Sequence, residues 1–266
     1  MQLKELLSGT IPADVLVQFS GRFDIVGTIA IVRLPPELAA YKIPVADAIL
    51  SLRKNVHTVL NKVHKVSSDA RTAEYEILAG DTTVTEYHEG GFRYRFDVLT
   101  AFFTSHLAHE RMRVTGQVTP GELVLVPFCG VGPFAIPAAG RGARVTAIEQ
   151  NPDAFCYLQE NCALNHVQDR IQPILGDAWD TSLALEKCYD RIIIPTPYGM
   201  DAILDRFAPF VRDRGVIHFY TFKAGNEIAD LIDTFSEKGF VPACYRSCGN
   251  VAPGISRWVF DLVKKG

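Results

Sequence analysis

The sequence predicts an α/β fold in which a doubly wound, mainly parallel sheet ends in an antiparallel hairpin and is preceded by a small α+β domain. From Gly121 onward, short apolar runs alternate regularly with helical stretches, as in the βαβ units of a parallel sheet. The last two strand-like runs have no helix between them, so they must pair antiparallel, because a parallel crossover needs about a dozen residues or more. We therefore expect two domains, over residues 1–92 and 93–266.

The small domain is predicted from its β-branched runs and the residues that interrupt them. A helical stretch opens the chain, and the alternating residues Phe23 to Arg33 then indicate a strand or a bent pair of strands. Pro35 ends this segment. The elements expected after it are a helix over 45–55, strands over 58–63, 72–77 and 82–87, and a link over 94–113 that begins extended and becomes helical.

The large domain is predicted as alternating strands and helices. It begins with a strand over 123–126, a loop that contains two glycines, and a helix that starts at Pro133, since proline suits the first helical position. The elements expected after it are a strand over 144–148, a helix over 152–164, a strand over 171–175, a short helix, a strand over 191–194, a helix over 200–211, a strand over 215–221, a helix over 227–238, and strands over 241–246 and 256–263.

Composition narrows the class of protein. With 266 residues, 48% hydrophobic and 21% charged, the chain can bury a large core. No apolar run approaches the roughly 20 residues of a membrane helix, and the opening MQLKELLSGT is too polar for a signal peptide, so we expect a cytoplasmic protein. The six cysteines form no CxxC pair, which predicts buried free thiols and neither a metal site nor a disulfide framework.

One segment of the small domain is basic, although the formal net charge of the chain is -3. This segment contains five basic residues and one acidic residue, Asp69, and two histidines are interleaved with them. Such a local patch can contact nucleic-acid phosphates. From charge alone, however, a solvated face of the small domain is the favoured interpretation. The basic residues are Arg53, Lys54, Lys62, Lys65 and Arg71.

The loop after the first strand of the large domain predicts a ligand. In the segment from Phe128 to Phe134, Gly130 and Gly132 let the backbone turn sharply and approach a ligand where a Cβ atom would collide. Glu149 stands at the end of the next strand, where its carboxylate can accept both hydroxyl groups of an adenosine ribose. The same spacing also fits a dinucleotide fold that holds a pyrophosphate at the helix start, and this alternative stays open here.

Further polar or rigid residues follow the other strands. Asn151 and Pro152 come after Glu149, Asp177 ends the third strand, and Pro195 follows the fourth. All lie at carboxyl ends of strands, where an open α/β sheet binds its ligand. Asp177 can hydrogen-bond an adenine amino group or, alternatively, cap the next helix. Pro195 can line the site, although two prolines there are equally typical of a rigid strand exit.

A parallel sheet that ends in an antiparallel hairpin resembles the Rossmann-like fold of class I methyltransferases, which bind S-adenosylmethionine. Segments spread over nearly the whole chain add a narrower resemblance, to the archaeal and eukaryotic tRNA guanine-37 N1-methyltransferases and the related aminocarboxypropyl transferases of wyosine biosynthesis. These segments are Phe23–Gly27, Glu76–Asp81, Glu110–Arg111, Phe128–Phe134, Asn151–Ala154, Pro173–Asp177 and Gly215–Tyr220.

The resemblance assigns roles to individual residues. It places Arg71 and Glu110 beside the target guanine, where Glu110 would take the N1 proton as general base and Arg71 would stabilise the charge that develops on O6. Arg111 would pair with the carboxylate of the cofactor. The anticodon stem-loop of tRNA is the partner that it implies. Without the resemblance, the two residues 110 and 111 would be read as exposed helix positions.

The chain departs from the family pattern in three respects. Val126 stands where the family usually has an acid, and Pro195-Thr196-Pro197 replaces an Asn-Leu-Pro segment. The extra N-terminal domain of many members has no counterpart here, which predicts more local tRNA recognition. The aminocarboxypropyl branch and a noncatalytic RNA-binding paralogue therefore remain alternatives, although the tail from Cys248 to Asp261 is more similar to the methyltransferase branch.

Overall fold

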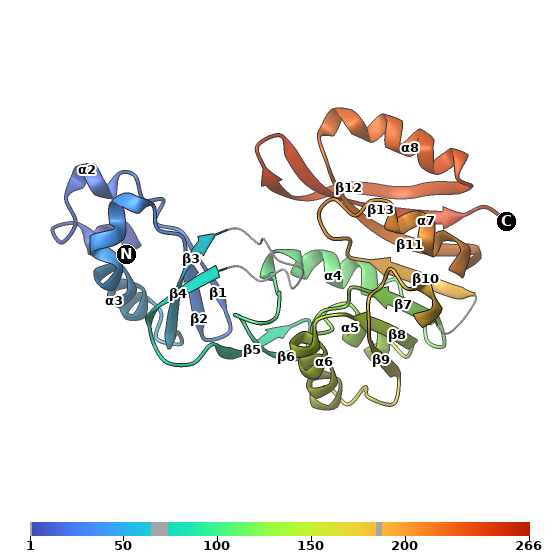
Figure 1. Cartoon of the computed structure of the whole chain (residues 1–266), viewed down its shortest axis with the longest axis horizontal. Coiled ribbons are helices and arrows are strands. Elements are labelled where there is room, and N and C mark those ends of the chain that lie inside the picture. The colour runs from blue at the N-terminus through green and yellow to red at the C-terminus, as the bar shows by residue number, and fades with distance from the viewer. Residues whose placement is uncertain (1, 65–73, 185–187) are drawn as a thin grey trace. The chain divides into compact units, whose positions relative to one another are not determined.

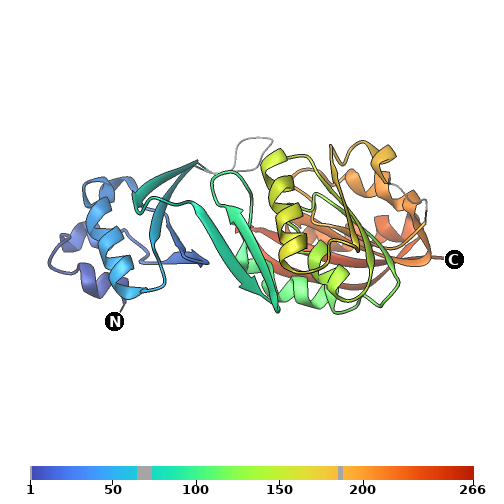
Figure 2. The ribbon, with the colours of Figure 1, turned by 90° about the horizontal axis from the view of Figure 1, so that it is seen from below.

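The computed structural model describes residues 2–64, 74–184 and 188–266, which form two compact units. The first unit spans Met1–His88 and Arg93–Phe103, and the second spans Glu89–Phe92 and Thr104–Gly266. Figures 1 and 2 show a smaller α+β unit at the N-terminus and a larger α/β unit that contains the C-terminus. The predicted fold class is confirmed by the topology of these units.

The first unit packs helices on a mixed sheet with the strand order β1-β2-β3-β4. The run from Phe23 to Arg33 forms an antiparallel pair that reverses at Gly27, where φ is +58°. Strands β2 and β3 are parallel, and the connection between them contains α3, which buries Val45, Ala46 and Ile49. The elements are α1 (Leu3–Leu7), α2 (Ala13–Leu16), β1 (Phe23–Val26), β2 (Ile29–Val32), η1 (Pro36–Tyr41), α3 (Lys42–Leu52), β3 (Thr58–His64) and β4 (Glu74–Ala79).

A two-stranded hairpin of β5 (Val84–Glu89) and β6 (Phe92–Asp97) follows. Gly90 and Gly91 both have positive φ, +60° and +86°, which is the conformation that a tight two-residue hairpin turn requires. The chain then forms a short 3-10 turn, η2 (Ser105–Leu107), and helix α4 (Ala108–Thr115). The expected link over 94–113 is thus extended at first and helical at its end.

The second unit contains, among its described residues, a seven-stranded sheet in the order β12-β13-β11-β10-β7-β8-β9, which runs from top to bottom in Figure 1. Its strands are β7 (Leu123–Pro127), β8 (Arg144–Glu149), β9 (Ile171–Leu175), β10 (Tyr189–Ile194), β11 (Val211–Lys223), β12 (Phe240–Ala252) and β13 (Ile255–Lys264). Its helices after α4 are α5 (Ala135–Gly140), α6 (Pro152–Leu164), η3 (Thr181–Leu183), α7 (Ile203–Phe207), η4 (Ala208–Phe210), η5 (Gly225–Glu227) and α8 (Ile228–Glu237).

The central parallel strands of this sheet consist mainly of buried apolar residues. Strands β7 and β10 are buried along almost their whole length, as expected for strands that are covered on both faces. In Figure 2, α5 and α6 lie across one face of the sheet, in green to yellow-green. Helix α6 starts at Pro152, as predicted, because the Asn151 side chain caps it by accepting from the backbone N–H of Asp153 at 3.0 Å. Strand β13 lies antiparallel to both β11 and β12, which confirms the predicted terminal hairpin.

The predicted helix over 200–211 is wrong in length. The α-helical part covers only Ile203–Phe207, and a 3-10 turn over Ala208–Phe210 follows it. Pro209 explains the difference, because proline has no backbone N–H and clashes with the preceding helical turn. Strand β11 consequently begins at Val211, four residues earlier than expected.

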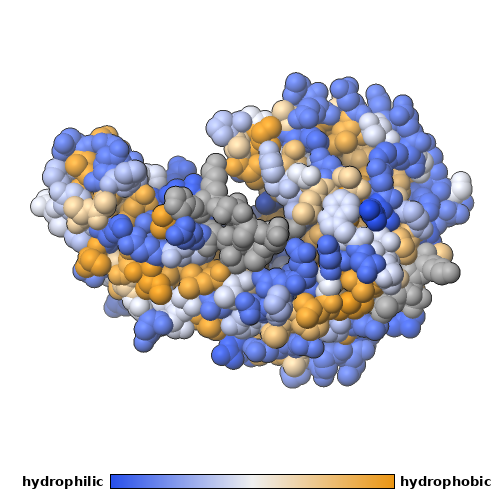
Figure 3. Space-filling view, viewed as in Figure 1, coloured by the Kyte–Doolittle hydropathy of each residue, from blue (hydrophilic) through white to orange (hydrophobic). Residues whose placement is uncertain are grey.

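None of the helices in the described part of the chain is long and apolar enough to cross a membrane. On the face shown in Figure 3, hydrophilic side chains and smaller apolar patches alternate over both units.

Candidate functional site

The loop between β7 and α5 reverses the chain with three left-handed residues. Phe128 has φ +56°, Gly130 +55° and Gly132 +96°. A non-glycine residue in this region costs about 1–2 kcal/mol, so the conformation of Phe128 is held by its surroundings. The backbone N–H of Cys129 donates to the Ile148 carbonyl at 3.0 Å, which fixes the loop against the end of β8.

A side chain at Gly132 would be strained by the φ of +96° and would also displace the ends of two buried side chains. A Cβ atom at this position would lie 2.8 Å from Ile136 Cδ1 and 2.8 Å from Leu158 Cδ1, closer than atoms in contact can approach. The loop therefore packs its backbone directly on α5 and α6. This packing leaves the amide groups of the loop at the carboxyl edge of the sheet, as in a phosphate or adenosyl cradle.

Glu149 is held by the same loop. Its Oε2 accepts the backbone N–H of Gly130 at 2.7 Å, and its Oε1 accepts the N–H of Asn151 at 2.9 Å. Each carboxylate oxygen can still accept a second hydrogen bond. The structure thus brings together the predicted glycine loop and the predicted ribose acceptor, nineteen residues apart in the chain.

The other predicted residues at this edge take less specific positions. The Oδ1 atom of Asp177 accepts the backbone N–H of Trp179 at 3.0 Å, and the residue is exposed. Asp177 does not cap the next helix, because the N-cap of η3 is Asp180, whose side chain accepts the backbone N–H of Ser182. Pro195 directly follows β10 and is partly buried. Val126 is fully buried within β7, so an acid at this position would need a partner inside the core.

Glu110 lies on α4 and is only 3% exposed. Arg113 Nη2 donates to its Oε1 at 2.7 Å, and the Tyr220 hydroxyl donates to the same oxygen at 3.1 Å. Arg246 binds the other oxygen through Nε, at 3.1 Å, and through Nη2. Burial alone would raise the pKa of Glu110, but the hydrogen bonds from the two arginines outweigh it and hold the pKa below its usual range. Glu110 is therefore an ionised, oriented carboxylate at neutral pH.

Arg111 points elsewhere on the same helix. Its Nε and Nη2 atoms donate to the two carboxylate oxygens of Glu89 at 2.6 and 2.5 Å, and Nη2 also donates to the Thr104 carbonyl at 2.9 Å. The residue is 2% exposed. The expected pairing of Arg111 with a cofactor carboxylate would require it to share or exchange this bidentate partner, and that role stays a prediction.

A series of buried charged residues extends from Glu110 through Arg113 into the sheet and holds Arg113 in place. Asp261 accepts from Arg113 Nη1 at 2.6 Å and from His218 Nδ1 at 2.6 Å. Arg191 Nη1 lies 2.6 Å from His218 Nε2, and since arginine can only donate, Nε2 is the acceptor and His218 is the neutral Nδ1–H tautomer. Burial lowers the pKa of His218, which agrees with the neutral form.

Sequence reasoning assigned no role to the six residues that surround Glu110 in this network, which are Arg113, Arg191, His218, Tyr220, Arg246 and Asp261. The detectable signal was polar residues inside apolar strands, such as Asp261 between Phe260 and Leu262 on β13, because a buried charge needs a partner. The partner itself lies 148 positions away in the chain, which no periodicity reveals.

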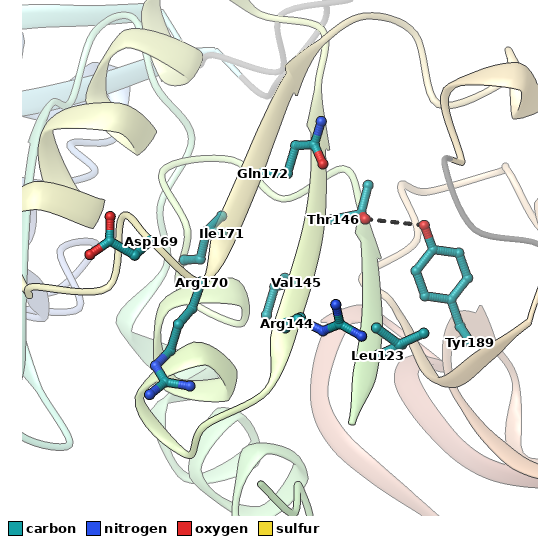
Figure 4. Close-up of a pocket in the computed structure, with 9 residues that line it drawn as sticks. All are labelled: Leu123, Arg144, Val145, Thr146, Asp169, Arg170, Ile171, Gln172 and Tyr189. Atoms are coloured by element: carbon teal, nitrogen blue, oxygen red, sulfur yellow. Dashed lines mark hydrogen bonds between the residues drawn. The ribbon is translucent and has the colours of Figure 1, made fainter. Parts of the chain in front are cut away.

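Three residues of the predicted basic segment, Lys65, Asp69 and Arg71, lie outside the described residues. A pocket of about 200 Å³ opens beside Arg144, Arg170 and Tyr189, which lie at the amino ends of the strands, opposite the edge that carries Glu149 (Figure 4). Within the described ranges, no cluster of His, Cys, Asp or Glu could hold a metal ion.

Comparisons with known proteins match both units. A family model described as the TRM5/TYW2 methyltransferase domain matches residues 85–238, and one described as the TYW2 N-terminal domain matches residues 3–83. The tRNA (guanine(37)-N(1))-methyltransferase Trm5b of Pyrococcus abyssi is 41% identical over 201 residues, which cover 75% of this chain and 59% of that protein. The chain thus spans less than two thirds of the length of that relative.

A second relative belongs to the other branch. The tRNA(Phe) (4-demethylwyosine(37)-C(7)) aminocarboxypropyltransferase of Pyrococcus horikoshii is 32% identical over 220 residues, which cover 82% of this chain and 78% of that protein. Among solved structures, the complex of aTrm5 and tRNALeu superposes with a TM-score of 0.89 at 26% identity and covers all of this chain and 78% of that one.

Proposed function

Because the chain belongs to the TRM5/TYW2 methyltransferase family, we propose that it transfers the methyl group of S-adenosylmethionine to N1 of guanine 37 in tRNA. The observation that carries this proposal is the buried, ionised carboxylate of Glu110, held by two arginines in the unit that also carries the glycine loop. The chain spans 59% of the length of Trm5b. The choice of guanine N1 as the target atom is therefore inferred from the relatives together with the site.

The residues present fit an adenosyl cofactor. Glu149 offers an oriented carboxylate for the ribose hydroxyls, and Gly130 and Gly132 keep side chains away from the loop beside it. We assign Phe128, Asp177 and Pro195 to the same site from their positions after β7, β9 and β10. When bound, S-adenosylmethionine supplies an electrophilic methyl group on a sulfonium centre.

The protein's own contribution is then proton removal and alignment. Guanine N1 carries a proton and becomes nucleophilic only when that proton leaves, so a carboxylate within hydrogen-bond reach is needed. Glu110 is ionised, and Arg113 and Tyr220 fix its direction. The low pKa makes it a weak base, however, while both arginines remain on it. Arg246, whose side chain is 36% exposed, is the partner that can turn away toward a substrate.

Recognition of tRNA is assigned to the first unit and its basic segment. Arg53 and Lys54 are exposed at the end of α3, and Lys62 is partly buried on β3. Arg71 belongs to this segment by sequence, and we retain it as the group that stabilises charge on guanine O6. The anticodon stem-loop is the proposed contact.

A second function, transfer of an aminocarboxypropyl group from the same cofactor, has a specific observation in its favour. Residues 3–83 match the N-terminal domain of the TYW2 branch, and the Pyrococcus horikoshii relative is matched over more of its length than Trm5b. The two reactions move different carbon groups, so they are separable by labelling.

The experiment uses two preparations of S-adenosylmethionine, labelled either in the methyl group or in the aminocarboxypropyl chain. Each is incubated with the full chain and either a tRNA transcript with guanine 37 or tRNA(Phe) carrying 4-demethylwyosine. We expect only methyl label, and only on the transcript. Label from the aminocarboxypropyl chain on the modified tRNA would replace the proposal with the aminocarboxypropyl reaction. If neither tRNA became labelled, the chain would belong to the family but both proposed transfer reactions would be refuted.

Cofactor binding is tested separately by calorimetric titration of S-adenosylmethionine. Replacing Glu149 by glutamine removes charge-assisted hydrogen bonds worth about 1.5–3 kcal/mol each, which corresponds to roughly 10- to 150-fold in Kd. The exposed Asp153, on the first turn of α6, gives the matched control Asp153→Asn. Equal affinities for both variants would remove Glu149 from the cofactor site.

A further inference from the structure

Arg257 lies at the carboxyl edge of the sheet, where none of the described residues provides a counter-ion for it. It lies near the start of β13, opposite Phe222 of β11, and its guanidinium carbon is 5.1 Å from the centre of the Phe222 ring. The side chain is partly buried. Within the described part of the chain, no hydrogen bond or ion pair joins the guanidinium group to another residue, whereas the other arginines near Glu110 are all paired.

A partly buried charge is costly unless water, the Phe222 ring or a ligand compensates it. Burial lowers the pKa of Arg257, and the positive charge of Arg111 adds to that effect. Lys223, the last residue of the neighbouring strand β11, is instead paired with Asp201 at 2.8 Å. Lys223 is therefore neutralised by a carboxylate, whereas no described residue does the same for Arg257. Groups that remain charged and uncompensated in a partly buried position mark candidate binding sites.

An exposed aromatic side chain completes the feature. Tyr198, in the segment after β10, is 69% exposed, and its ring centre lies 5.2 Å from that of Phe222. Phe222 thus contacts both the tyrosine ring and the guanidinium group. Aromatic rings and arginine side chains are the groups on which proteins stack unpaired bases of RNA and hold their phosphates.

The position in the sheet favours RNA over the cofactor. Strand β13 is three strands from β7, which carries the glycine loop, and adjacent strands are about 4.8 Å apart, so the separation is roughly 14 Å. Arg257 lies on the side of Glu110, because Tyr220 and Cys248 are electrostatic neighbours of both residues. The anion expected there belongs to the substrate.

We propose that Tyr198 and Arg257 form a nucleotide subsite of the tRNA, in which Tyr198 stacks a base next to the target guanine and Arg257 binds a backbone phosphate. The inference rests on the proposed function, since it assumes a tRNA substrate. It assigns binding and positioning to these two residues and no part in proton transfer.

The experiment measures the Kd of the full chain for a tRNA transcript at several salt concentrations. Loss of one phosphate contact in Arg257→Gln should reduce the slope of log affinity against log salt by about 0.7–0.9. Arg257→Lys keeps the charge and should keep the slope. The control Arg212→Gln removes an exposed arginine at the start of β11, which is paired with Asp190, and should leave the slope unchanged.

Stacking is tested at Tyr198. Replacement by alanine should weaken tRNA binding about 5- to 150-fold, while Tyr198→Phe should stay within about twofold, because the ring alone stacks. Urea unfolding checks that each variant is folded.

Three results would overturn the subsite. One is an unchanged salt slope in Arg257→Gln. Another is an Arg257→Gln variant that binds S-adenosylmethionine more weakly but binds tRNA as the wild type does, which would assign Arg257 to the cofactor carboxylate. The third is equal tRNA affinity of the Tyr198 variants. A wild-type chain that binds no tRNA would instead refute the proposed function itself, so the two failures are distinguishable.

Discussion

Replacing Glu110 by glutamine separates the chemical role of this residue from its structural role. The amide retains the shape but loses the charge, so the hydrogen bonds from Arg113 and Arg246 lose their charge-assisted acceptor, at about 1.5–3 kcal/mol each. Arg113 keeps its contact with Asp261 at 2.6 Å, and the side chain of Arg246 is 36% exposed and can be hydrated. We therefore expect the free energy of unfolding to fall by about 2–3 kcal/mol, less than the total stability of an ordinary domain.

Methyl transfer should fall much further in the same variant. Loss of a positioned general base lowers kcat by about 10²- to 10⁴-fold, which is measured under saturating S-adenosylmethionine and tRNA transcript. The matched control is Asp261→Asn. Asp261 belongs to the same buried network but is linked to Glu110 only through Arg113, so this variant should cost about 3–5 kcal/mol of stability with a smaller loss of kcat. A Glu110→Gln variant within tenfold of wild type, or an equal loss of kcat in both variants, would refute the role of Glu110 as base.

Two further predictions concern stability. Burial would raise the pKa of Asp261, but hydrogen bonds from His218 and Arg113 hold it well below its usual range, so the stabilisation is complete above about pH 4 and is lost as the pH falls below that value. Urea unfolding from about pH 6 to pH 3 should show this decline in the wild type, and a decline of the same size in Asp261→Asn would contradict it. Gly132→Ala should lose about 1–3 kcal/mol more than Gly121→Ala, because both have positive φ but only Gly132 lacks room for a Cβ atom. Equal unfolding midpoints would show that α5 and α6 adjust freely.

The features that follow from local chemistry were predictable from the sequence. Asn151 and Pro152 mark the start of α6 because a side-chain acceptor and a fixed φ act within one turn of the backbone. The spacing of Gly130 and Glu149 was informative for the same reason, since one βαβ unit brings them within hydrogen-bond distance. The absence of a helix between the last two strands was sufficient to predict their pairing.

The surroundings of Glu110 were not predictable in this way. Its partners come from α4, β11 and β12, and Arg246 is separated from it by 136 positions. Only the order of strands in the sheet brings these side chains together. The expected exposure of Glu110 and Arg111 on a helix was also misleading, because a charged residue is buried when the fold supplies a partner, as Glu89 does for Arg111.

Nucleoside mass spectrometry of the reaction product tests the central claim most directly. The full chain is incubated with S-adenosylmethionine and a tRNA transcript that carries guanine at position 37, and the tRNA is then digested to nucleosides. We predict 1-methylguanosine from this transcript and none from a transcript with another base at position 37. A methyl group on a different atom or nucleotide, or an aminocarboxypropyl adduct in its place, would contradict the assignment of this site to guanine N1.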